Sequence, residues 1–317
     1  GGPEVLQLKT DYPVPRISEG QILVKNNISG INYIDTNFRS GLYPSPKPEV
    51  LGREAASVIV ALGPGTEHHG FKVGDRVIWK NSTSYAEYSA VPAIKAVKIP
   101  DNVSDEDAVA TSISGLTALA LIMETYPVKK GDIILVHAAA GSVGFLMVQL
   151  LKLLGAVVIG TAGGREKVDL VKSLGADHVI DYRSEEDKDW VKAVKKITNG
   201  RGVDAVYDSV GKDTWEGSID AVKKKGFIVW FGSSSGPIPP IPLPRITPKC
   251  IAICRPNSGL YTETHEEYQA YMNNLFELLV SDKLKVKIHK LYQLEEIQQA
   301  HKDLERRGTI GKLLLKL

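Results

Sequence analysis

The sequence predicts an α/β protein in which a doubly wound parallel sheet is joined to a second domain rich in β-strands. Three observations lead to this prediction. From Asp132 onward, apolar strand-like runs alternate with helical patterns, whereas residues 1–112 contain short β-rich runs separated by glycine and proline. The length of 317 residues also favours two domains over one.

The first segment contains short strands. Residues 21–32, 56–65 and 73–80 are β-rich runs bounded by turn residues. Around Asp105 the pattern changes, and apolar residues recur at helical spacing through residues 105–126. We expect a β-rich domain that closes with a helix.

The middle segment alternates regularly between strands and helices. Crossover helices join parallel strands, and nearly continuous apolar strands are typical of a sheet covered on both faces. The expected strands are 133–138, 156–162, 177–182, 203–210 and 227–232, and the expected helices are 144–155, 165–175, a charged segment after 182, and 213–226.

A proline-rich stretch, 237–248, follows the last of these strands and is unsuited to a helix or a central strand. We expect a short apolar strand at 249–254, with Cys250 and Cys254 as small buried side chains. A helix at 266–280 and a tail of strand, helix and strand complete the chain. The tail resembles the first segment, so we assign residues 1–116 and 256–317 to one domain and 117–255 to an inserted domain.

Composition narrows the class of protein. A net charge of +2 implies no polyanionic partner, and two cysteines form no disulfide framework, which favours a cytoplasmic protein. We find no apolar run of the roughly eighteen residues that a membrane span needs. The chain begins Gly1-Gly2 without methionine, so we expect a missing native N-terminal segment, which leaves targeting open.

The turn at residues 139–144, Ala-Ala-Gly-Ser-Val-Gly, carries the strongest functional signal. It follows an apolar strand and opens an amphipathic helix, as a dinucleotide-binding turn does. Gly141 and Gly144 suit close approach of pyrophosphate, and the helix N-terminus offers free N–H groups. Ala139 replaces the first glycine of the usual pattern, which is tolerable if its φ stays negative. The alternative is an ordinary strand-to-helix turn.

The second strand of this region favours NADP(H) over NAD(H). An NAD site places Asp or Glu at the end of that strand, but here it ends in residues 160–164 without an acid, and Arg165 and Lys167 follow. Cations suit a 2′-phosphate, and Tyr182 can flank the phosphate or the adenine. Two alternatives stay open: these cations are merely solvated, or the cofactor is NAD(H).

The sequence resembles the zinc-free quinone oxidoreductases of the medium-chain dehydrogenase/reductase superfamily, the zeta-crystallin-like branch. The resemblance covers nearly the whole chain and includes 30–44, 51–56, 71–77, 115–118, 137–144, 208–216, 231–236 and 308–315. It implies a GroES-like catalytic domain and a Rossmann NADPH-binding domain. Relatives pair through an edge strand, so we expect a homodimer through 249–254.

The resemblance also implies the site residues. Asn32 is expected to donate to a carbonyl oxygen or to orient the nicotinamide, and Tyr43 is expected to contribute a hydroxyl and an aromatic wall. From spacing alone Asn32 is equally well explained as a turn residue. The expected cofactor contacts are Asn32, Thr117, Ala140, Gly141, Ser142, Val143, Gly163, Lys167, Tyr182, Ser209, Phe231, Ser233 and Lys312, the last meeting the pyrophosphate.

We expect no metal ion. Zinc-dependent relatives need cysteine and histidine ligands, but the segment where a Gly-His-Glu motif would supply histidine reads Gly52-Arg53-Glu54, and no cysteine precedes Cys250. Asp35 and Glu54 are expected to be structural partners of arginines such as Arg53. His137 is expected to pack rather than to react.

The leading function is therefore reduction of a quinone by NADPH, which requires mainly that the two reactants be close and correctly oriented. Reduction of the C=C bond of enones uses the same hydride geometry and stays open as an alternative. A second alternative is an NADPH-binding protein that binds AU-rich RNA, as some relatives do, although no RNA-binding motif is present.

Overall fold

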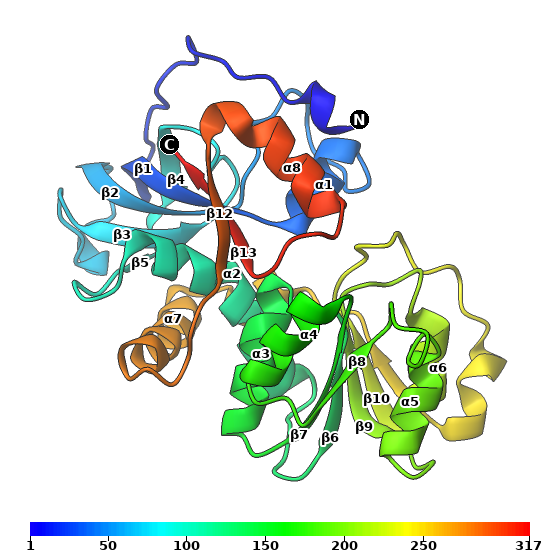
Figure 1. The fold of residues 1–317 in the computed structure, drawn as a ribbon. Helices are drawn as coiled ribbons and strands as arrows, with labels where there is room; N and C mark the ends of the chain where they lie inside the picture. Colours follow the sequence, from blue (N-terminus) through cyan, green and yellow to red (C-terminus); the bar gives the residue numbers. More distant parts are fainter. The chain divides into compact units, whose positions relative to one another are not determined.

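The computed structural model describes every residue, Gly1–Leu317, and the chain divides into two units (Figure 1). One unit comprises Gly1–Leu116 and Thr262–Leu317, and the other comprises Thr117–Tyr261. The second boundary lies a few residues beyond the expected one. The reason is a short 3₁₀ turn, in which the Ser258 hydroxyl accepts a hydrogen bond from Thr117 and the Tyr261 hydroxyl lies 2.8 Å from that of Thr125.

The unit Thr117–Tyr261 is built on a six-stranded sheet in which the paired strands run parallel, in the order β11-β10-β9-β6-β7-β8. The order reverses between β6 and β9, and ligands of such sheets bind at the carboxyl ends of the strands at that point. The predicted doubly wound sheet is thus confirmed. The strands are β6 (Ile133–Val136), β7 (Val157–Ala162), β8 (His178–Asp181), β9 (Val203–Asp208), β10 (Val222–Trp230) and β11 (Ala252–Cys254).

Crossover helices cover this sheet, as parallel strands require. Their amphipathic faces pack on a core that includes Leu135, Val206, Ile228 and Trp230, all buried. The helices are α3 (Ser142–Leu153), α4 (Arg165–Ser173), α5 (Trp190–Ile197) and α6 (Trp215–Ala221).

The helix expected over 213–226 is shorter than predicted. It ends at Ala221, and β10 begins at Val222, which pairs in parallel with Val203 of β9. Lys223 reaches the buried carboxylate of Asp204, and Lys225 has φ +57°. Pairing with a neighbouring strand and this ion pair override the helical pattern of the lysine-rich stretch.

The strand expected over 249–254 is also shorter, and its cysteines are not buried. Residues Thr247–Lys249 form a 3₁₀ turn, and Cys250 takes a left-handed conformation with φ +50°. Only Ala252–Cys254 pair with β10, Cys250 is exposed, and Cys254 is partly exposed. The Lys249 ammonium group accounts for this break, because it turns back to donate to the carbonyl groups of Ile219, Asp220 and Val222.

The other unit is built on a seven-stranded sheet in the order β12-β13-β1-β2-β3-β5, with β4 paired to β1. The C-terminal strand β13 pairs antiparallel with β1, which joins the tail to the first segment. The strands are β1 (Gln21–Ile31), β2 (Glu54–Leu62), β3 (Arg76–Lys80), β4 (Tyr88–Pro92), β5 (Ala96–Lys98), β12 (Ile288–Gln293) and β13 (Lys312–Lys316). The helices are α1 (Tyr33–Ser40), α2 (Asp105–Ala120), α7 (His265–Val280) and α8 (Ile297–Glu305), and the boundary between the units falls within α2, after Leu116.

One expectation about apolar runs was wrong. The helical stretch Asp105–Thr125, in which α2 continues into a π turn, is long and apolar enough to cross a membrane by length and composition. Its most apolar window is 78% buried inside the protein. A helix that is apolar on all sides is also the pattern of a core helix, and burial assigns this one to the core.

Candidate functional site

The glycine turn between β6 and α3 has the backbone that close approach of a ligand requires. Ala138, not Ala139, takes the left-handed conformation, with φ +51°. A Cβ atom on Gly144 would lie 2.4 Å from the carbonyl oxygen of Ala138, so only glycine lets the helix pack this closely on the turn. Gly141 caps the helix without a side-chain hydrogen bond. The turn therefore presents main-chain N–H groups to an anion.

The expected phosphate contacts come together at this turn. Ser142 and Val143 form the first turn of α3 and are partly exposed, whereas Ala140 is 3% exposed. Ala140 therefore shapes the turn through its backbone. His137, just before the turn, is buried with Nδ1 3.0 Å from the Thr161 hydroxyl, and burial lowers the pKa of its imidazole. His137 is a packing residue.

The ends of β7 and β8 form a second cluster around Gly163. A Cβ atom there would lie 2.5 Å from the Tyr182 hydroxyl and 2.9 Å from Nε of Arg183, so both side chains lie directly over this glycine. The Asp181 carboxylate holds the cluster in shape by accepting from the main-chain N–H groups of Gly164 and Arg183. The Asp181 carboxylate, at the end of β8, is thus already bound by main-chain N–H groups.

Two cations meet at this cluster, and one expected cation does not. Lys167 is half-buried, and burial together with the nearby Arg183 guanidinium lowers the pKa of its ammonium group. The Arg165 side chain is 94% exposed and pairs with Asp169 at 3.6 Å, so it extends along the surface of α4. Arg165 was predicted together with Lys167, whereas Arg183 was missed. The position of Arg183, immediately after Tyr182 at a strand end, was the available signal.

The remaining candidates of this unit lie at the ends of β9 and β10 and at its first residue. A Cβ atom on Gly232 would lie 2.5 Å from the carbonyl oxygen of Ser209, so the backbone around Ser209 touches the loop that carries Phe231 and Ser233. The buried Asp208 carboxylate accepts from the N–H groups of Val210 and Gly211 and fixes this loop. Thr117 is buried at the start of the unit.

In the other unit, Asn32 lies at the N-cap of α1, between β1 and the helix. Its Nδ2 donates to Glu54 at 2.9 Å and to the Gly30 carbonyl at 3.4 Å, and its Oδ1 accepts from the Lys312 ammonium at 2.6 Å. Glu54 and Lys312 form an ion pair at 2.6 Å, with side chains 0% and 2% exposed. The second Glu54 oxygen accepts from the N–H of Ile113.

Two expectations change here. Lys312 was expected to meet the pyrophosphate, but its ammonium is buried against Glu54 and Asn32, so a contact with a ligand phosphate is incompatible with this conformation. Glu54 was expected to pair with an arginine such as Arg53, and that expectation was wrong because Lys312 is its partner. A buried lysine needs a carboxylate, and residues distant in sequence supply it.

Asp35 was likewise expected to pair with an arginine, but it stabilises the start of α1. Its Oδ2 accepts from the main-chain N–H of Asn32 and from the Tyr85 hydroxyl, both at 2.8 Å. Complete burial raises the pKa of this carboxyl to about 6, against the lowering effect of these hydrogen bonds. Tyr43, the other expected catalytic residue, is partly exposed and packs edge-on against Phe38, with ring centroids 5.6 Å apart.

Known protein families match segments in both units of the chain. Residues 142–277 match the zinc-binding dehydrogenase family, and residues 18–101 match the alcohol dehydrogenase GroES-like domain. The chain is 43% identical over 321 residues to the quinone oxidoreductase of Salmonella typhimurium, covering 99% of this chain and 96% of that protein. It is 40% identical over 316 residues to the probable quinone oxidoreductase of Schizosaccharomyces pombe, covering 99% and 94%.

A solved structure agrees along the full chain. The crystal structure of the Escherichia coli quinone oxidoreductase complexed with NADPH matches with a TM-score of 0.94 at 41% identity, covering 100% of this chain and 97% of that one. The chain belongs to the quinone oxidoreductase family of the medium-chain dehydrogenase/reductase superfamily. The predicted GroES-like and Rossmann folds are confirmed for this quinone oxidoreductase family member.

This quinone oxidoreductase family member has no cluster that resembles a metal site, although one matched family is described as zinc-binding. No group of three or more His, Cys, Asp or Glu side chains is placed to hold a metal ion anywhere in Gly1–Leu317. Glu54 follows the position at which zinc-dependent relatives carry a histidine ligand, and its carboxylate forms an ion pair with Lys312.

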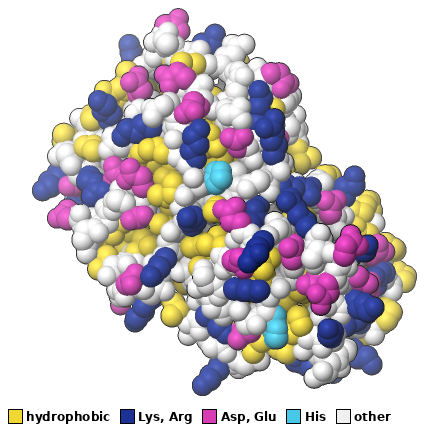
Figure 2. Space-filling model, viewed as in Figure 1, with side chains coloured by type: hydrophobic (Ala, Val, Ile, Leu, Met, Phe, Trp, Pro, Cys, Tyr) yellow, Lys and Arg dark blue, Asp and Glu magenta, His cyan; other side chains and the backbone are white.

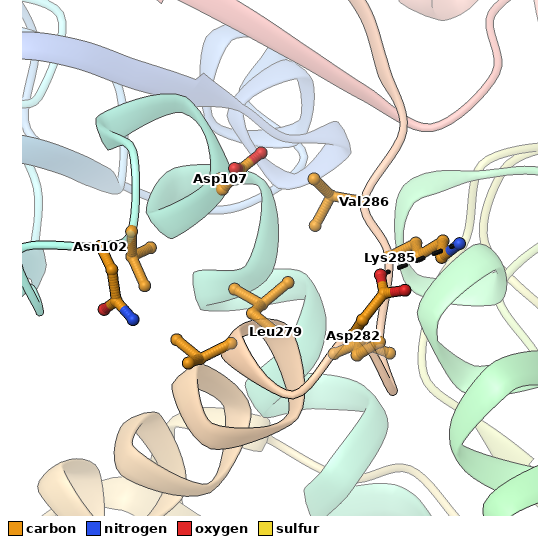
Figure 3. Close-up of a pocket in the computed structure, with 9 residues that line it drawn as sticks. Asn102, Asp107, Leu279, Asp282, Lys285 and Val286 are labelled. Carbon is orange, nitrogen blue, oxygen red and sulfur yellow. Dashed lines mark ion pairs between the residues drawn. The ribbon is translucent and has the colours of Figure 1, made fainter.

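A pocket of about 250 Å³ lies apart from the predicted residues (Figure 3). It is formed between the start of α2 and the end of α7, with Asp107 and Leu279 on opposite sides. Lys285 and Asp282 form an ion pair at its edge, at 3.8 Å. None of the predicted catalytic or cofactor residues lines it, so it is not the site that the sequence predicts.

Proposed function

We propose that this protein is an NADPH-dependent quinone oxidoreductase that passes a hydride equivalent from NADPH to a quinone without a metal ion. The observation that carries the proposal is the cluster at Gly163. There, Lys167 and Arg183 converge where β7 ends without a carboxylate that could bind a ribose 2′-hydroxyl. Relatives named quinone oxidoreductase support the assignment of the substrate.

The residues present fit NADPH. The main-chain N–H groups of Ser142 and Val143 would hold the pyrophosphate, because the Gly141 N–H already donates to the Ala138 carbonyl, and Lys167, Tyr182 and Arg183 would hold the 2′-phosphate. The absence of a side chain at Gly163 lets the Tyr182 hydroxyl and Nε of Arg183 lie directly over its backbone. Thr117, Ser209, Phe231 and Ser233 would contact the nicotinamide half of the cofactor. When bound, NADPH supplies the hydride.

Asn32 has a narrower role than its amide suggests. Both hydrogens of Nδ2 point at acceptors, Glu54 and the Gly30 carbonyl, whereas Oδ1 accepts from Lys312 and faces the main-chain N–H of Asp35 in the capping box of α1. Protein groups therefore engage both ends of the amide. We assign Asn32 the role of positioning this part of the site, rather than donating to a quinone.

Tyr43 is the expected wall and hydroxyl of the quinone site. Its ring is held edge-on by Phe38 and is partly exposed. A quinone is already electron-poor, so the chemistry needs position and orientation more than a strong acid. The Asp35 carboxyl, in the first turn of α1, is 0% exposed and so cannot reach the quinone, and solvent supplies the proton that completes the hydroquinone.

The proposal is tested by following the oxidation of NADPH and of NADH with 1,2-naphthoquinone and with an enone, in the presence of EDTA. We expect turnover of the quinone with NADPH, unaffected by EDTA. Faster turnover of the enone would favour the double-bond reductase instead. Binding of NADPH without turnover of either substrate would contradict the enzymatic assignment.

We also propose a homodimer joined through β11. This strand pairs with β10 on one side only and is the edge of its sheet, and Ala252 is exposed. Static light scattering on the wild type and on Ile253→Pro tests this pairing. A dimer for both proteins would contradict pairing through β11.

RNA binding and location are secondary proposals. On the face that Figure 2 shows, basic and acidic side chains are interspersed, with no continuous basic surface, so RNA binding has little electrostatic support. Release of bound AU-rich RNA upon addition of NADPH would support a site shared by the two ligands. Absence of RNA binding at moderate salt would exclude the RNA-binding role. We propose a cytoplasmic location, which cell fractionation tests.

A further inference from the structure

Arg53 is a cation that the protein leaves without a carboxylate. The residue lies just before β2, and its side chain is partly buried, with Nε buried and without an acceptor. Glu54 is committed to Lys312, Asn32 and the N–H of Ile113. Asp35 lies near enough for Arg53 to lower its pKa but does not form an ion pair with it.

The guanidinium group is held instead by an aromatic ring. Its central carbon lies 3.7 Å from the centroid of Phe38, a cation–π contact. The same ring packs edge-on against Tyr43, and Phe38 belongs to α1, the helix that Asn32 caps. Arg53, Phe38 and Tyr43 therefore form one continuous group, which includes one expected catalytic residue, Tyr43, and lies on the helix that the other, Asn32, caps, within a single unit of the protein.

A partly buried charge that lacks a hydrogen-bonded counter-ion is costly, and most proteins pair it. The cation–π contact fixes the plane of the guanidinium group but accepts none of its N–H donors. A ligand oxygen carrying negative charge would complete the site. Such an oxygen arises in the proposed reaction.

We infer that Arg53 binds the quinone oxygen that becomes negatively charged as the hydride arrives. This inference rests on the proposed function. The hydride brings two electrons and one proton from NADPH, which converts the neutral quinone to a hydroquinone monoanion and NADPH to NADP⁺. One proton from solvent then gives the hydroquinone. The Arg53 N–H groups stabilise the anionic oxygen between these steps, as preorganised donors do elsewhere.

The first test uses the wild-type protein with NADP⁺ and 4-nitrophenol, whose ionised form is coloured and mimics the anionic product. A nearby cation lowers the pKa of a bound phenol, and one pKa unit corresponds to a tenfold change in the ionisation equilibrium. We expect the bound phenol to ionise at lower pH than the free one. Arg53→Lys retains part of this shift, and Arg53→Met loses it. An unchanged shift in Arg53→Met, or no shift in the wild type, overturns the inference.

The second test is kinetic. Arg53→Met is expected to lower kcat/KM for 1,2-naphthoquinone by about 10- to 100-fold, the range for loss of one charged hydrogen bond, while KM for NADPH is unchanged. Arg16→Met, which removes an exposed arginine from the same unit, is the matched control and should behave as wild type. Equal quinone rates for wild type and Arg53→Met overturn the inference and leave the proposed function intact. No quinone turnover by the wild type defeats the proposed function itself.

Discussion

The buried ion pair between Glu54 and Lys312 yields a prediction that can be worked out in magnitude. Glu54→Gln removes the negative charge and leaves the Lys312 ammonium buried, with side chains only 0% and 2% exposed in the native pair. The glutamine amide carries a donor nitrogen in place of one carboxylate oxygen, so it cannot accept at both places where Glu54 accepts now. Breaking a buried pair by removing one partner costs about 3–5 kcal/mol.

Thermal and urea unfolding measure this loss. For a unit of this size, 1 kcal/mol corresponds to about 2–4 °C, so we expect Tm to fall by roughly 6–20 °C. The double variant Glu54→Gln with Lys312→Met should recover part of the loss, because no unpaired charge remains. A change below about 1 kcal/mol in Glu54→Gln would refute the reasoning. If Lys312→Met left Tm unchanged and raised KM for NADPH, the result would instead support the sequence prediction that Lys312 contacts the pyrophosphate.

Three further predictions follow from the cofactor site and the buried carboxyl. Arg183→Ala should raise KM for NADPH about tenfold and leave KM for NADH unchanged, whereas Arg165→Ala, at a solvent-exposed position, should change neither KM. Equal effects of the two substitutions on KM for NADPH would contradict the assignment of Arg183 to the 2′-phosphate. Burial raises the pKa of Asp35 to about 6, so its contribution to stability is present below about pH 4 and is lost as pH rises through 6. Urea unfolding across this window should show that Asp35→Asn lacks about 3 kcal/mol of the pH dependence of the wild-type free energy of unfolding. The same pH dependence in Asp35→Asn and in the wild type would contradict this prediction. Gly144→Ala places a Cβ atom 2.4 Å from a carbonyl oxygen and should cost about 1–3 kcal/mol and weaken NADPH binding, whereas Gly308→Ala, with open space around it, should be neutral in both assays.

The doubly wound sheet was predictable because its signals are local. Apolar strands, amphipathic helices and the glycine turn each occupy a continuous stretch, and parallel connections leave little choice of arrangement. The lysine-rich stretch after Ala221 was predicted wrongly for a physical reason. Its pairing with β9 and the ion pair of Lys223 with Asp204 are tertiary contacts that override local propensity.

The candidate site was predictable only in part. The phosphate turn, Gly163 and Tyr182 could be located because a strand end and a helix start mark them. Glu54 and Lys312 are 258 residues apart, and no periodicity links them, so their pairing was invisible in the sequence. Arg183 was missed because a cation after a strand resembles any solvated side chain until the glycine beside it is seen.

The central claim is tested most directly by one rate measurement. Protein dialysed against EDTA is mixed with NADPH and 1,2-naphthoquinone, and the initial rate of NADPH oxidation is compared with that for NADH under the same conditions. We predict undiminished turnover with NADPH and much slower turnover with NADH. Loss of activity that Zn²⁺ restores, or equal rates with the two cofactors, would contradict this claim.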